Sequence, residues 1–170
     1  MKDTMARATL TLEPLTREAF APFGDVIAKE GARHHLINGG SCTRYHDLAP
    51  VQLLGEAGRA LINIFAPQPV VLPYAISLVE RHPLGSQAFV PLSRDPFAVV
   101  VCEDEGGKPV RPRAFITDGR QGVNYRANVW HAPLIALADG AEFLVVDRGG
   151  EGVNLEEFVF ETSLTIQDPP

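Results

Sequence analysis

The spacing of proline and glycine is the feature that most limits how this chain can fold. The 170 residues include 14 prolines and 15 glycines. They interrupt the sequence at intervals of roughly 8–15 residues, with short runs rich in β-branched and aromatic residues between them. Such intervals suit short strands joined by turns better than long helices. Because no repeat, low-complexity segment or change of composition marks a linker, we predict one domain over residues 1–170.

Several of the apolar runs alternate as half-buried strands do. In the run 60–65, Ile62 and Ile64 share one face while Asn63 and Phe65 share the other. The only clear helix signal lies in 16–24, where Thr16 is a candidate N-cap. This pattern predicts an all-β jelly roll or small barrel with one short N-terminal helix. The candidate strands are 44–48, 60–67, 70–82, 87–93, 97–104, 113–118, 122–131, 134–138, 142–149 and 154–160.

The two ends and the overall composition narrow the class of protein. Residues 1–8 have the character of a loose leader, and 161–170 that of a weakly anchored tail. No run of 18 apolar residues and no signal-peptide pattern occurs, so we expect a cytoplasmic protein without a membrane segment. The two cysteines are not in a C-x-x-C spacing, and Cys102 follows three valines, which predicts a core position. The net charge is −6 with no basic block, which argues against nucleic acid as a partner.

One strand ends in polar residues where its alternation predicts an interior position. In "YAISLVERHPLGSQAF", Glu80 and His82 share the parity of Ile76 and Leu78, so we expect them to point inward. His131 continues a mostly apolar face of the run 122–131 in the same way. Unpaired charges are costly in a protein interior. Either these side chains are paired structurally, or they form the floor of a site.

The same residues resemble the metal-binding motifs of a cupin barrel. Glu80, His82 and Gln87 align with the first cupin motif, and His131 aligns with the histidine of the second. Carboxylate and imidazole are good ligands for a divalent ion, whereas an amide oxygen is weak. A divalent ion (Ni or Zn) held by these four residues and a metal-free polar pocket both remain open.

Two further groups are candidates for holding an acidic substrate, since the negative net charge requires a local cation or amide pocket. The turn at Asn38 has backbone amides suited to an oxyanion, and Arg44 and Tyr45 follow it on a predicted edge strand. Arg148 lies at a strand end before a double-glycine turn. The alternatives are a solvated edge for the first group and an ion pair with Asp147 or Glu151 for Arg148.

Six stretches together resemble the ureidoglycolate lyase (formerly ureidoglycolate hydrolase) family. The resemblance runs from about Leu12 to Phe160, nearly the whole chain, and "ERHPLGSQAF" and "INGG…RYHDL" are its most specific parts. This sequence departs from the family pattern at Asn128, where a glycine is expected nearby, and at Ala132, where a second histidine is common. The stretches are "EPLTREAFAPFGDVI", "LINGGSCTRYHDLA", "ERHPLGSQAFVPL", "GVNY", "VWHAPL" and "FLVVDRGGEGVNLEE".

The resemblance implies a homodimeric, cupin-like barrel that splits (S)-ureidoglycolate into glyoxylate and urea in allantoin catabolism, with no required cofactor. That cleavage needs a base for the hydroxyl proton, a donor for the departing urea and a holder for the carboxylate. Our hypothesis makes His82 the base, His131 the donor to urea and Glu80 the orienting carboxylate. Gln87 would bind the ureido group, Arg148, Arg44 or the amides near Asn38 would bind the carboxylate, and Tyr45 would donate to a carbonyl.

Two other functions remain as alternatives. One is a metal-dependent cupin of another class, an isomerase or dioxygenase, with Glu80, His82, Gln87 and His131 as ligands. The other is a cupin that binds a small acid without converting it. Stoichiometric metal and loss of activity on chelation would favour the first, and binding without turnover would favour the second.

Overall fold

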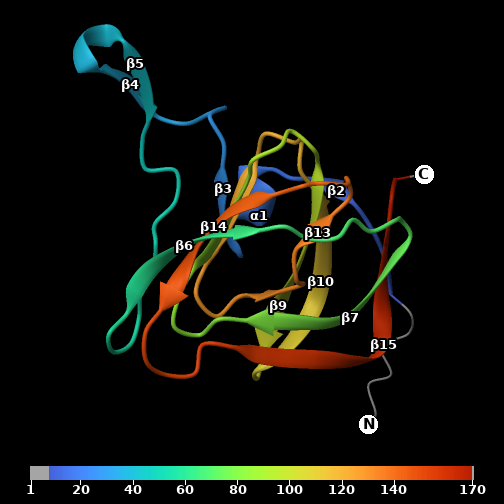
Figure 1. Ribbon diagram of the computed structural model, residues 1–170. Helices are drawn as coiled ribbons and strands as arrows, with labels where there is room; N and C mark the ends of the chain where they lie inside the picture. The colour runs from blue at the N-terminus through green and yellow to red at the C-terminus, as the bar shows by residue number, and fades with distance from the viewer. Residues whose placement is uncertain (1–7, 170) are drawn as a thin grey trace.

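The computed structural model describes residues 8–169 and is almost entirely β-sheet (Figure 1). Two sheets form a cupin-like jelly roll, and a separate hairpin projects from it. In chain order the elements are β1 (Thr9–Thr11), β2 (Glu13–Pro14), α1 (Arg17–Phe20), β3 (Gly24–Ile27), β4 (His34–Ile37), η1 (Asn38–Gly40), β5 (Cys42–Tyr45), β6 (Arg59–Phe65), β7 (Tyr74–Arg81), β8 (Gln87–Pro91), β9 (Phe97–Glu105), β10 (Lys108–Ile116), β11 (Gly122–Tyr125), β12 (Trp130–His131), β13 (Ile135–Ala136), β14 (Phe143–Gly149) and β15 (Glu156–Gln167).

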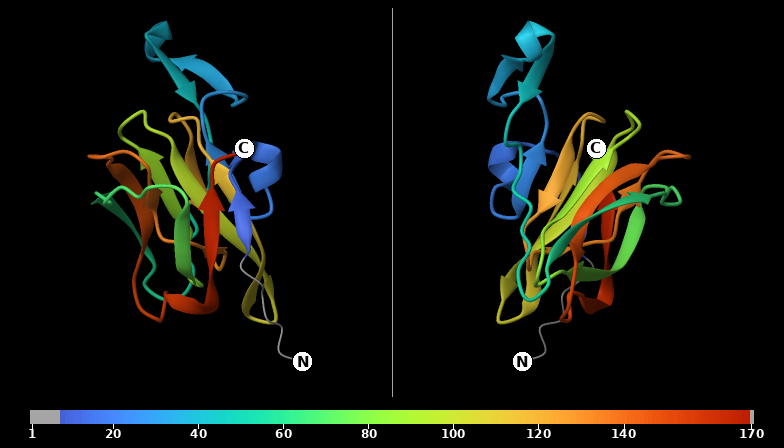
Figure 2. Two further views of the ribbon diagram at one scale, coloured as in Figure 1. Left: turned by 90° about the vertical axis from the view of Figure 1, so that its right-hand side faces the viewer. Right: turned by 60° about the vertical axis from the view of Figure 1, so that its left-hand side comes forward.

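The two sheets differ in size and in the order of their strands. The larger sheet has the order β1-β15-β7-β12-β9-β10-β2, with β13 also paired to β9, and the smaller has the order β3-β11-β8-β14-β6. The larger sheet curls so that β1 also contacts β10. Figure 2 shows the two sheets facing each other, with the hairpin β4–β5 standing clear of both.

A core lies on each face of the larger sheet. In β9, Val99 and Val101 pack into the first core, against the smaller sheet, while Val100 and Cys102 pack into the second, inside the curl. This is why the run "FAVVVC" is continuously apolar rather than alternating. Burial also raises the pKa of the Cys102 thiol to about 12, as expected for an inert core cysteine.

The predicted fold class is confirmed, including the short helix. The Thr16 side chain accepts a hydrogen bond from the backbone N–H of Ala19 at 3.1 Å and caps α1 as expected. The helix ends at Phe20, whose ring is fully buried, and so is shorter than the predicted range 16–24; Gly24 begins β3. Within the described residues, no helix is long and apolar enough to cross a membrane.

The prediction of a weakly anchored tail over 161–170 is wrong for its first seven residues. Strand β15 continues to Gln167, pairing with β7 and, in parallel, with β1. Leu164 and Ile166 are almost completely buried in the second core. The predicted leader 1–8 lies outside the described residues except for Ala8, whose carbonyl accepts a hydrogen bond from Thr165.

The predicted continuous strand 122–131 is also wrong, because it is divided into β11 and β12. Asn128 has a φ of 69° between them, a left-handed conformation that asparagine tolerates better than most residues. Its N–H donates to the carbonyl of His82 at 2.8 Å, so the turn ties β12 to the end of β7. The break therefore helps to set the position of His131.

Candidate active site

The site begins at the end of β7. There the pairing of β7 with β15 shifts, and residues of β7 change the face of the sheet on which they lie. Ile76 and Val79 both line the second core, and the pairing of β7 with β15 shifts between Val159 and Leu164. Glu80 therefore does not share the face of Ile76, as its parity had predicted. It lies opposite His131 in the ladder, facing the first core.

The two histidines of this cluster have the same hydrogen-bonding arrangement. His82 Nδ1 lies 2.8 Å from the carbonyl oxygen of Asn154, and His131 Nδ1 lies 2.9 Å from that of Val129. When each ring is neutral, Nδ1 carries the proton and donates it to the carbonyl, so Nε2 presents a lone pair. Both Nε2 atoms are buried and have no hydrogen-bond partner within the described structure.

Glu80 stands between the two unpartnered nitrogens. Its Oε1 lies 3.8 Å from His82 Nε2 and 3.7 Å from His131 Nε2. Burial raises the pKa of this carboxyl above its ordinary value, the neighbouring His82 opposes that shift, and Glu157 adds to it. The Glu80 and His82 side chains remain 22% and 17% exposed, so solvent reaches this end of the cluster.

His131 is held more tightly than His82. Its ring stacks on Tyr125 with centroids 4.1 Å apart, and its side chain is only 2% exposed. Burial lowers the pKa of His131 to about 3, so the ring stays neutral at physiological pH. A neutral ring whose Nδ1–H is already used accepts hydrogen bonds at Nε2, which argues against the predicted role of His131 as a proton donor.

A row of polar side chains extends the cluster toward β6. Gln87 in this row was predicted as a site residue, whereas Asn63 and Asp147 were not. Gln87 lies opposite Tyr125 in the ladder, and its Nε2 donates to Asp147 at 3.5 Å. Asn63 Nδ2 donates to the other oxygen of Asp147 at 3.0 Å. These bonds leave the buried Gln87 Oε1 without a partner in the described residues. Asp147 shares the parity of Phe143 and Val145, which was the available sequence signal, whereas Asn63 lies on the face opposite the two isoleucines of its strand and had none.

The donor set fits a divalent metal ion. One ligand atom each from Glu80, His82 and His131 lies within 4.8 Å of the other two. The free Nε2 lone pairs and the hydrogen-bonded Nδ1 atoms are the arrangement that metal-binding histidines usually have. Gln87, the fourth predicted ligand, offers only a neutral amide oxygen, which is a weak donor.

Arg148, predicted as a substrate anchor, holds two loops through its guanidinium. Its guanidinium donates to the carbonyl oxygens of Leu54 (2.6 Å), Glu56 (3.0 Å) and Glu151 (2.9 Å). Neither an ion pair with Asp147 nor one with Glu151 forms among the described residues. Gly85 permits the close packing, because a Cβ there would lie 2.5 Å from that of Arg148.

The remaining predicted residues lie on the projecting hairpin. Asn38 is in η1, and Arg44 and Tyr45 are in β5, a hairpin that pairs with neither sheet (Figure 1). The structure therefore brings Glu80, His82 and His131 together with Gln87 nearby, but it does not bring the hairpin residues to them within one copy.

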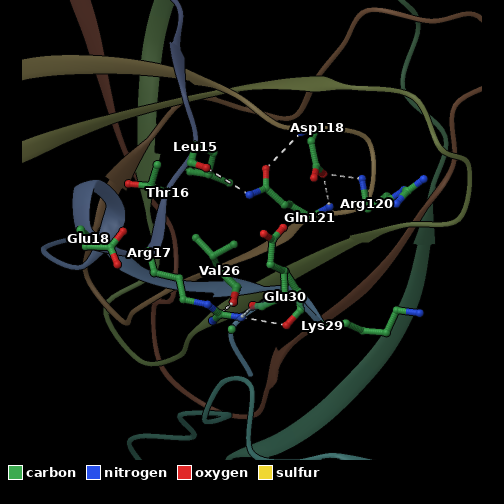
Figure 3. A pocket seen from close by; sticks show the side chains of 12 residues that line it. Leu15, Thr16, Arg17, Glu18, Val26, Lys29, Glu30, Asp118, Arg120 and Gln121 are labelled. Carbon is green, nitrogen blue, oxygen red and sulfur yellow. Dashed lines mark hydrogen bonds between the residues drawn. The ribbon is translucent and has the colours of Figure 1, made fainter. Parts of the chain in front are cut away.

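A hollow beside α1 is separate from this cluster. It is lined by α1, β3 and the turn at 118–121, and Figure 3 shows its side chains. One of its cations, Arg17, donates to the carbonyls of Val26, Ala28 and Glu30. None of the four cluster residues lines it, so we do not assign the chemistry there.

Comparison of the sequence with known proteins shows which family the chain belongs to. The sequence profile of the ureidoglycolate lyase family matches residues 7–167. The chain belongs to the ureidoglycolate lyase family. A ureidoglycolate lyase of Rhizobium etli (strain CIAT 652) is 57% identical over 160 residues, covering 94% of this chain and 96% of that protein. A ureidoglycolate lyase of Brucella melitensis biotype 2 is 60% identical over 152 residues, covering 89% and 90%.

One solved structure resembles part of this chain. It is a dTDP sugar isomerase from Desulfovibrio desulfuricans G20, with a TM-score of 0.41 and 16% sequence identity, covering 79% of this chain and 84% of that one.

Proposed function

We propose that this protein is a ureidoglycolate lyase that cleaves (S)-ureidoglycolate to glyoxylate and urea by acid–base chemistry in purine degradation. The observation that carries the proposal is the meeting of Glu80, His82 and His131, with two free Nε2 atoms around one carboxyl, in a member of this family. The wider cupin alternatives, an isomerase or dioxygenase, have no comparable support from the relatives.

The cleavage requires one proton to leave and one to arrive. His82 Nε2 takes the proton of the substrate hydroxyl, the C–O bond becomes a carbonyl, and the C–N bond breaks with its electron pair moving to nitrogen. Glu80 gives its proton to that nitrogen, which leaves as urea. Passage of a proton from His82 back to Glu80, across the 3.8 Å between them, restores the starting state.

We assign Glu80 the donor role because burial favours its protonated form. His131 is neutral, and its Nε2 lone pair holds the substrate by accepting a hydrogen bond from it. This assignment moves the donor role from His131 to Glu80 and keeps His82 as the base.

The ureido group has several N–H donors, and it fits the chain of acceptors beside the cluster. The free Gln87 Oε1 accepts one N–H, and Asp147 lies directly behind it with a carboxylate oriented by Asn63. A buried acceptor without a partner costs free energy until a ligand donates to it. The ureido end therefore binds at Gln87.

A divalent ion would be held by Glu80, His82 and His131, and there it would supply positive charge that polarises the substrate oxygens. The same His82 lone pair cannot serve both as a ligand and as the base. We propose that the metal-free route operates, because the fourth donor, the Gln87 amide, is weak.

We infer further that the active form is a homodimer and that it works in the cytoplasm. Cys42 is a free exposed thiol and Cys102 a free buried one, which is compatible with a reducing compartment.

Incubation of the purified, untagged protein with racemic ureidoglycolate tests the proposal, with urea and glyoxylate followed by NMR. We expect both products in equal amounts from one enantiomer, with and without a chelator. Binding without product would support the acid-binding alternative, and activity abolished by the chelator and restored by Ni or Zn would overturn the metal-free route.

A further inference from the structure

A basic hairpin stands away from the body of the molecule. We call residues 33–46 the arm; it contains β4, η1 and β5, and Figures 1 and 2 show it projecting beyond both sheets. Its strands pair only with each other. Leu36, near its tip, is 65% exposed. A two-stranded hairpin is marginally stable by itself in water, so an arm of this kind gains stability when a surface covers it.

The arm differs in charge from the rest of the chain. It carries two arginines and three histidines and no Asp or Glu, in a protein of net charge −6. On the barrel, the exposed Glu157 lies opposite Glu80 beside the open end of the cluster. The ion-pair partners of Glu80 in the described residues are the two histidines, so no arginine or lysine is paired with it there. The cluster of Glu80, His82, His131 and Gln87 thus contains no arginine or lysine for a substrate carboxylate, and the Arg148 guanidinium already donates to three backbone carbonyls.

Strand β6 offers the second half of a contact. It is the last strand of the smaller sheet, so one of its edges is unpaired among the described strands. Ile62 and Ile64 on its outer face are 76% and 56% exposed. Long apolar edge strands pair readily with other chains. On the inner face, Asn63 leads through Asp147 to Gln87, so β6 borders the site.

We propose that the arm of one copy packs on β6 of a second copy and brings Arg44 to the substrate carboxylate bound in that second copy. A two-fold axis between the copies forms two such contacts at once, since each copy has an arm and a β6 edge. A second copy is the occupant because the chain itself carries both complementary halves, a basic apolar-tipped arm and an acidic site bordered by an apolar edge. The role of Arg44 rests on the proposed lyase function, but the packing does not.

Sedimentation velocity of single variants tests the packing. The wild-type chain sediments as a dimer, and Leu36→Asp and Ile62→Asp each shift it to a monomer with an unchanged far-ultraviolet circular dichroism spectrum. The control is Val71→Asp, which changes an 84% exposed valine outside both surfaces and leaves the dimer intact. A monomeric wild type, or a dimer that survives either the Leu36 or the Ile62 substitution, overturns the proposal.

The native cysteines allow a second, independent test. Cys42 is exposed on the arm and Cys102 is buried, so an added cysteine on β6 meets only Cys42 across the contact. Mild oxidation of Ile62→Cys gives a covalent dimer that disappears when Cys42→Ser is added, while Val71→Cys gives none. An Ile62→Cys protein that forms no Cys42-dependent link contradicts the placement of the arm.

Subunit mixing tests whether Arg44 acts in the partner's site. Arg44→Ala raises KM about 10-fold or more, the usual loss for a charge-assisted hydrogen bond. His82→Ala is inactive in the proposed mechanism. At low substrate, an equal mixture of the two variants regains about a quarter of the wild-type activity, because half of the dimers contain one intact site. Activity equal to the average of the parents places Arg44 in its own copy and overturns this step. A wild type without lyase activity rejects the proposed function, while the sedimentation and cross-linking results stand.

Discussion

One ring nitrogen determines what His82 can do. Its Nδ1 is occupied by the carbonyl of Asn154, which leaves the buried Nε2 as the free base. We expect His82→Ala to lower kcat by about 10²- to 10⁴-fold, the contribution typical of general-base catalysis. Added imidazole should restore part of the rate, because it can occupy the space left by the ring. Steady-state assays with circular dichroism as the check on folding measure both effects; a folded variant with full turnover would eliminate His82 as the base.

The Glu80 carboxyl should set the alkaline limit of activity. If its protonated form gives the proton to urea, kcat/KM falls as pH rises through the Glu80 pKa, which burial places above its ordinary value. The charge of Glu157 contributes to that increase, so Glu157→Gln lowers the pKa and moves this limb of the pH–rate profile to lower pH. The measurement is the pH profile of kcat/KM for the two proteins.

The control for that shift lies on the same strand. Glu161 is exposed on β15, and it does not contribute to the Glu80 pKa. Glu161→Gln should therefore leave the profile in place. An equal shift in both variants would mean that net charge moves the limb, and no shift in Glu157→Gln would mean that another group gives the proton.

At the scale of the elements, Arg148 joins β14 to two loops. Its side chain is only 7% exposed, and it donates to three carbonyl oxygens. Lysine cannot reproduce the planar fork of donors, so we expect Arg148→Lys to lower the free energy of unfolding by about 2–4 kcal/mol. Arg120→Ala, at an exposed arginine, should change it by less than about 0.5 kcal/mol. Urea denaturation measures both; a loss of substrate affinity without a loss of stability would return Arg148 to the role of anchor.

The elements that could be predicted were those with strong local patterns. The strand over Arg59–Phe65 followed from its alternation, and the helix from Thr16 as a cap. The end of β15 was missed because Glu161, Thr162 and Ser163 look like a polar tail. Its order comes from pairing with β1, at the opposite end of the chain, and local sequence carries no signal for such a partner.

The same distinction between local patterns and distant partners applies to the site. The residue types at 80, 82 and 131 predicted a polar cluster, and the structure brings these three together. The face was predicted wrongly, since a shift in the pairing of two strands is not visible in the sequence of one. The contacts of Arg148 could not be predicted, because its partners are carbonyl oxygens of loops, which every residue possesses and no motif marks.

At the scale of the whole molecule, the site groups affect stability in opposite directions. The folded pKa of His131 is about 3, so below about pH 6.5 the unfolded chain takes up a proton that the folded chain does not, and stability falls as pH decreases from there to about 3. The raised pKa of Glu80 has the opposite sign, because folding disfavours its charged form and stability falls as pH increases from the ordinary glutamate value through the raised one.

We therefore expect the free energy of unfolding of His131→Gln to fall less steeply between pH 6.5 and 4 than that of the wild type. The two slopes differ by at most the amount that one bound proton contributes. Tyr125→Phe is the matched control, since it alters the same buried stack without removing a group that titrates in this range. Urea denaturation at pH 7.5, 6, 5 and 4, at one protein concentration because of the proposed dimer, measures the slopes. Equal slopes for wild type and His131→Gln would show that His131 takes up its proton in the folded protein near the same pH as in the unfolded chain. The ring would then be able to act as a charged donor after all, and the division of labour between His131 and Glu80 would have to be reversed.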